Sequence, residues 1–130
     1  STGMSAGGLW TTWMVLYRSQ WLASAAPMSG GFYSQWYSSP ESSLPVMLVW
    51  GGPADIYNGY SFDASNNAFS SQLQGDGHFV VECEHTGGHT VPMGAAEFIW
   101  TFLEEHPRGL DAEPWSEGLP SSLPSYCAIP

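Results

Sequence analysis

The stretch Ser1-Thr2-Gly3-Met4-Ser5-Ala6-Gly7-Gly8-Leu9-Trp10 decides the fold, because it contains the pattern G-x-S-x-G around Ser5. Glycine two residues on either side of a serine lets neighbouring backbone pass where a Cβ would clash. An apolar segment with helical spacing follows, so Ser5 would lie at a helix N-terminus, where free N–H groups stabilise negative charge. The pattern is typical of a nucleophile elbow, a tight strand-to-helix turn that presents a reactive serine. An ordinary glycine turn is the alternative, and the rest of the chain has to decide between them.

Composition and charge narrow the classes of partner. The 130 residues include 12 Asp and Glu against 2 Lys and Arg, which gives a net charge of −10. This charge argues against electrostatic binding of nucleic acid or an anionic membrane, and it suits a neutral substrate or an uncharged polymer. No run of 18 apolar residues is present, which argues against a membrane span. The length predicts one domain with a small core, in which apolar segments can need a partner to bury them.

Apolar segments with helical and with strand-like patterns follow one another along the chain. Helices are expected over 6–20, 61–73 and 93–105, and strands over 22–27, 45–50 and 78–83. The run 45–50 has no alternation and is stopped by Gly51-Gly52-Pro53, which indicates a fully buried parallel strand. This order, with glycine-rich loops after the strands, predicts an α/β fold with parallel strands.

An aromatic stripe runs along the first expected helix. Trp10, Trp13, Tyr17 and Trp21 recur at steps of three and four residues, with polar residues between them. We expect this stripe to pack into the core.

Three side chains suited to acyl transfer follow successive expected strands or turns. Such chemistry needs a nucleophile, a base that takes its proton and a carboxylate that orients the base. Ser5, Asp55 and His89 occur in that order, which is the chain order of α/β-hydrolases and differs from the chymotrypsin and subtilisin orders. Asp63 is a rival acid, although it falls in or beside a helix, and His85 shares a loop with His89.

A metal site is a further alternative for the same loop. Glu84, His85 and His89 are residue types that bind zinc, but a zinc site there would leave the glycine-serine pattern unexplained. We therefore expect no metal and no cofactor. The two cysteines, Cys83 and Cys127, leave free thiols and a disulfide equally open on counting alone.

The chain resembles the carboxyl-terminal half of an α/β-hydrolase of the polyhydroxybutyrate depolymerase and feruloyl esterase group. The resemblance spans residues 2 to about 107. It rests on the following segments: Gly3-Met4-Ser5-Ala6-Gly7-Gly8, Pro45-Val46-Met47-Leu48-Val49-Trp50-Gly51-Gly52-Pro53-Ala54-Asp55, Gly87-Gly88-His89-Thr90-Val91-Pro92, and a helix bearing Ile99-Trp100.

The resemblance implies a role for each residue of the constellation. Ser5 would be the nucleophile, Asp55 the acid, His89 the base, and the backbone N–H of Ala6 an oxyanion-hole donor. The activity implied is that of a secreted or periplasmic serine esterase acting on polyester or on acylated polysaccharide. A peptidase on the same fold and a catalytically inactive binding module are the alternatives. Secretion also favours a disulfide between Cys83 and Cys127 that anchors the tail.

The resemblance also implies that part of the fold lies outside these residues. Residues 1–107 would be the carboxyl-terminal part of the catalytic domain, and 108–130 a proline-rich tail packed on it. In the family, four or more strands and a loop with the second oxyanion-hole donor precede the elbow. We therefore expect the strand leading into Gly3 to be cut away and a sheet edge to be exposed. The missing elements would come from the amino-terminal half of the same hydrolase or from a companion chain.

Overall fold

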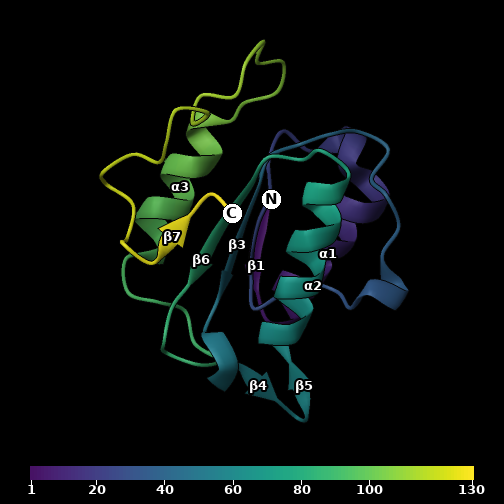
Figure 1. The fold of residues 1–130 in the computed structure, drawn as a ribbon, viewed down its shortest axis with the longest axis vertical. Coiled ribbons are helices and arrows are strands. Elements are labelled where there is room, and N and C mark those ends of the chain that lie inside the picture. The colour runs from purple at the N-terminus through teal and green to yellow at the C-terminus, as the bar shows by residue number, and fades with distance from the viewer.

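A five-stranded sheet with helices on both faces forms the centre of the computed structural model, which describes residues 1–130 (Figure 1). Its strand order is β1-β2-β3-β6-β7, and all neighbours are parallel except β6 and β7. The strands of this sheet are β1 (Thr2–Met4), β2 (Ala26–Met28), β3 (Val46–Trp50), β6 (Val80–Glu84) and β7 (Cys127–Ala128). The helices are α1 (Ala6–Arg18), α2 (Phe62–Gly75) and α3 (Ala95–Glu105). The predicted α/β organisation with parallel strands is confirmed.

The strands differ from expectation at several points. The strand expected over 22–27 is β2 from Ala26 to Met28, and β7 in the tail was not foreseen. Thr2 to Met4 form a strand where we expected none, because they pair in parallel with Ala26 to Met28 as β1. A two-stranded hairpin of β4 (Ile56–Tyr57) and β5 (Tyr60–Ser61) was not foreseen either. Strands of two or three residues are too short to produce a hydrophobic period, so the sequence pattern does not reveal them.

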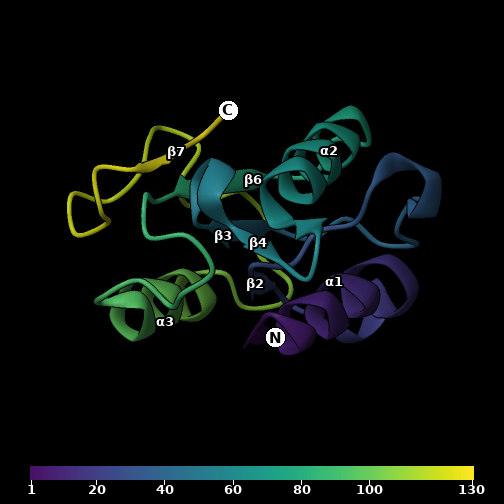
Figure 2. The same ribbon diagram turned by 90° about the horizontal axis from the view of Figure 1, so that it is seen from below.

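The central strand β3 is buried on both faces, which explains why its sequence does not alternate. On one face, Val46, Leu48 and Trp50 pack with residues of α1 and α2. On the other face, Met47 and Val49 pack with α3. Seen from the end, in Figure 2, α2 and α3 lie on opposite sides of the strands.

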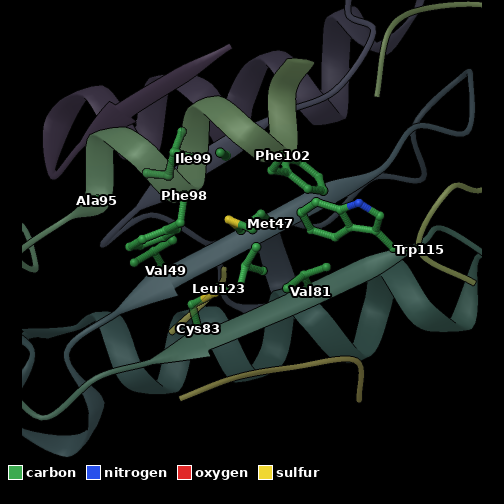
Figure 3. Packing of buried hydrophobic residues seen from close by; sticks show 11 residues of the cluster. Met47, Val49, Val81, Cys83, Ala95, Phe98, Ile99, Phe102, Trp115 and Leu123 are labelled. Atoms are coloured by element: carbon green, nitrogen blue, oxygen red, sulfur yellow. The ribbon is translucent and has the colours of Figure 1, made fainter. Parts of the chain in front are cut away.

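The second of these clusters also ties down the end of the chain (Figure 3). Its α3 side consists of Ala95, Phe98, Ile99 and Phe102, which face the strand residues Met47, Val49, Val81 and Cys83. Trp115 and Leu123, both buried, complete the cluster from the tail. The tail therefore contributes to the core and does not merely cover it.

A disulfide joins Cys83 of β6 to Cys127 of β7, as the resemblance to secreted esterases led us to expect. The two residues are 44 positions apart in the sequence and face each other across the antiparallel pair. Closing a loop of this length stabilises the folded state by about 4 kcal/mol through the lost entropy of the unfolded chain. The bond holds the tail against the strand that leads to the His89 loop.

The expectation for the aromatic stripe on α1 is wrong. Trp10 and Trp21 are 61% and 67% exposed, and the helix buries a face of small residues and aliphatics instead: Gly8, Thr11, Thr12, Val15 and Leu16. The cause is a close approach, since a Cβ on Gly8 would lie 2.2 Å from the Met28 carbonyl oxygen. Bulky rings cannot fit on that face, so they point outward.

None of the helices combines the length and hydrophobicity needed to cross a bilayer.

Candidate active site

Three loops at the carboxyl ends of parallel strands bring Ser5, Asp55 and His89 together. Ser5 follows β1, Asp55 follows β3 and His89 lies in the loop after β6. The distance from His89 Nε2 to Ser5 Oγ is 2.9 Å, and from His89 Nδ1 to Asp55 Oδ1 it is 2.7 Å. An imidazole with its proton on Nδ1 donates to Asp55 and accepts the Ser5 hydroxyl proton at Nε2. This end of the sheet carries the β4–β5 hairpin, at the bottom of Figure 1.

Ser5 sits in a strained backbone conformation that aims its side chain at His89. Its φ of 57° and ψ of −115° are unusual for a residue with a Cβ, and such strain costs about 1–3 kcal/mol. The Ser5 N–H donates to the Met28 carbonyl at 3.0 Å, which holds the turn against β2. A Cβ on Gly3 would lie 2.7 Å from the Gly7 carbonyl, whereas one on Gly7 would meet nothing within 4 Å. The turn therefore requires the first glycine of the motif for space, but not the second.

The Asp55 carboxylate is fully buried and is held by donors on both oxygens. His89 contacts Oδ1, while the Ser29 hydroxyl at 2.8 Å and the Gly51 N–H at 2.9 Å donate to Oδ2. These contacts satisfy both oxygens of the buried carboxylate and fix its orientation. The rival Asp63 lies on α2, where it accepts the Trp50 indole N–H at 2.9 Å. The structure thus brings Asp55, and not Asp63, to His89.

The His89 ring is fixed by the loop that carries it and by neighbouring aromatic rings. A Cβ on Gly51 would lie 1.9 Å from the Gly88 carbonyl oxygen, so this loop can reach β3 only because Gly51 has no side chain. Tyr57 and Phe62 stack on the imidazole with ring centroids 5.3 and 4.7 Å away and interplanar angles of 24° and 21°. Contacts of this kind restrict rotation of the ring.

His85 has a different role from His89 in the same loop. It is buried, and burial lowers its pKa, with the charge of Asp55 acting in the opposite direction. Its Nδ1 accepts the Gly87 N–H at 3.0 Å, which orders the turn before His89. No group of three His, Cys, Asp or Glu side chains converges in a way that could hold a metal ion, so the alternative metal site is not formed.

Ala6 is the first residue of α1, directly after Ser5. It lies at the positive end of a helix of 13 residues, where a backbone N–H can stabilise a developing oxyanion. Its role as a donor stays a prediction.

Sequence reasoning missed the side chains that support this arrangement, namely Ser29, Tyr57 and Phe62. Ser29 carries a weak signal, because it follows an expected strand and begins the run Ser29-Gly30-Gly31. Phe62 was expected only as an apolar member of the helix over 61–73, and Tyr57 carries no signal, since the β4–β5 hairpin that places it has no pattern of its own.

Comparison with known proteins gives one distant similarity. The chain is 27% identical over 162 aligned residues to an oxidized polyvinyl alcohol hydrolase of a Pseudomonas species. The alignment covers 84% of this chain and 41% of the relative, so the chain spans about two fifths of that protein. No protein-family model matches the chain, and no solved structure matches it.

Proposed function

We propose that the protein is a serine hydrolase that cleaves carboxylic esters through an acyl-enzyme intermediate. The observation that carries this proposal is the continuous chain of hydrogen bonds from Ser5 through His89 to Asp55. The distant similarity to a hydrolase supports it independently.

The geometry supports a role for each group in turn. His89 Nε2 takes the proton of Ser5 while Oγ attacks the ester carbonyl carbon, and Asp55 stabilises the imidazolium that forms. The Ala6 N–H binds the resulting oxyanion. His89 then returns the proton to the departing alcohol, which leaves an acyl group on Ser5. Water, activated by the same histidine, releases the acid and restores the enzyme.

Several observations bear on the substrate and the compartment. The excess of acidic side chains suits an uncharged substrate, such as a polyester or an acylated polysaccharide. The name of the distant relative adds oxidised polyvinyl alcohol as a second candidate substrate, separate from the esters. The disulfide supports a location in an oxidising compartment, either secreted or periplasmic.

Labelling and substrate panels test the proposed function. A fluorophosphonate should label Ser5, and mass spectrometry of the digested protein should locate the adduct there. Short-chain and aromatic esters should be turned over, and matched amides much more slowly. Faster turnover of amides would favour the peptidase. If the protein is not labelled and turns over neither esters nor oxidised polyvinyl alcohol, an inactive binding module is favoured.

We further propose that the amino-terminal half of the same hydrolase completes the sheet beside β1. β1 pairs with β2 on one side and has no partner on its other edge. Beside it, an apolar groove of about 250 Å³ runs along α3, lined among others by Met28, Ile99 and Trp100. Trp100 is 64% exposed, and open strand edges and contiguous apolar surface are both costly in a finished protein. The alignment covers only 41% of the distant relative, so that protein has residues outside the aligned part that can form further strands.

Expression of residues 1–130 alone and of the full encoded polypeptide tests this completion. We expect residues 1–130 alone to turn over esters at least about 100-fold more slowly than the full encoded polypeptide, because a second oxyanion donor would be lacking. Near-UV circular dichroism should show weaker tertiary packing. If residues 1–130 fold cooperatively and are fully active, the proposal is wrong. If ester turnover appears only when a separate polypeptide is added, a companion chain, and not the amino-terminal half of the same hydrolase, completes the sheet.

A further inference from the structure

Ser29 is a buried serine that the proposed reaction does not use directly. It follows β2 and is 1% exposed, and its hydroxyl lies 2.8 Å from Asp55 Oδ2. Its N–H donates to the Val49 carbonyl at 2.7 Å, so the backbone position is fixed by β3.

The backbone of Ser29 makes serine an unexpected choice there. Its φ is +42°, a conformation that favours glycine, and Gly30 and Gly31 follow it directly. A glycine at this position would adopt the conformation more easily than serine does. The strained position is nevertheless occupied by a residue whose hydroxyl meets the only carboxylate that contacts His89.

We infer that Ser29 is a positioning residue, which acts through Asp55 to hold the imidazole of His89 in register with Ser5. This inference rests on the proposed function. Two donors fix Oδ2, the Ser29 hydroxyl and the Gly51 N–H, and they leave Oδ1 directed at His89. Without the hydroxyl, only the Gly51 N–H holds Oδ2, so the carboxylate rotates more freely about its Cβ–Cγ bond and the population of rings aligned with Ser5 falls.

The test compares Ser29→Gly and Ser29→Ala in the full-length protein, with Ser70→Ala as the matched control. Ser70 is an equally buried serine on α2 whose hydroxyl accepts from Gln74 and does not meet a carboxylate. Both Ser29 variants should lower kcat by about 10- to 100-fold with KM little changed, the loss expected of a hydrogen bond to a charged group. Ser29→Gly also relieves the backbone strain at the positive φ, so this variant should be at least as stable as Ser29→Ala and still show a lowered kcat.

A double variant that combines Ser29→Gly with Asp55→Ala separates a positioning role of Ser29 from a purely structural one. If Ser29 acts through Asp55, adding Ser29→Gly to Asp55→Ala should cause no further loss of kcat, because the two residues form one unit. Equal losses in both backgrounds, or a Ser29→Gly variant with unchanged kcat, would overturn the inference. Fluorophosphonate labelling of the unsubstituted protein identifies the source of a failure. Without labelling the proposed function falls and the inference with it, whereas labelling with unaffected Ser29 variants removes the inference alone.

Discussion

Replacing Ser5 with alanine should lower ester turnover by about a millionfold, which is the loss seen when the nucleophile of such a triad is removed. The variant lacks the Oγ that His89 Nε2 contacts, so no acyl-enzyme can form. Its backbone should stay in place, because the N–H of residue 5 still donates to the Met28 carbonyl. Turnover of a chromogenic ester, with fluorophosphonate labelling in parallel, measures the effect.

Ser121→Ala is the matched control for this experiment. Ser121 is exposed in the tail and lies outside the constellation, so its replacement should leave turnover and labelling unchanged. Unaltered near-UV circular dichroism of Ser5→Ala would show that the loss is chemical and not a failure to fold. A Ser5→Ala variant that still hydrolyses esters would identify a different nucleophile and refute the proposed mechanism.

The sequence was sufficient to predict the longer elements, because their burial imposes a pattern. The run 45–50 is β3 from Val46 to Trp50, and 93–105 contains α3 from Ala95 to Glu105. Loop positions after these strands could also be predicted, since the carboxyl ends of parallel strands meet at one edge of a sheet. The structure accordingly brings Ser5, Asp55 and His89 within hydrogen-bonding distance.

What the sequence did not reveal depends on contacts between distant segments. Periodicity shows which residues of α1 share a face, but the close approach of Gly8 to Met28 decides which face is buried. Likewise, nothing local marks Ser29 as a partner of Asp55, because the two are 26 residues apart and meet only through the pairing of β2 with β3. Such contacts are properties of the assembled sheet.

Asp55→Asn should reduce kcat by about 10,000-fold, even though asparagine has nearly the same shape. If the asparagine oxygen stays toward His89, its NH₂ group faces the Gly51 N–H, which places donor against donor in a fully buried site. If the side chain flips, the oxygen accepts from Ser29 and Gly51, but the NH₂ group now donates to His89 Nδ1. The imidazole proton then moves to Nε2, which can no longer accept the proton of Ser5.

Asp63→Asn is the matched control, because an asparagine oxygen can still accept the Trp50 indole N–H. It should leave turnover close to that of the unsubstituted protein. Steady-state kinetics on one ester, with the free energy of unfolding from urea titration, separates lost catalysis from lost stability. The opposite result, an active Asp55→Asn and an inactive Asp63→Asn, would assign the role of the triad acid to Asp63. This assignment would require α2 to move towards His89. The contact between His89 and the fully buried Asp55 carboxylate opposes that rearrangement, because Asp55 would lose this partner in the core.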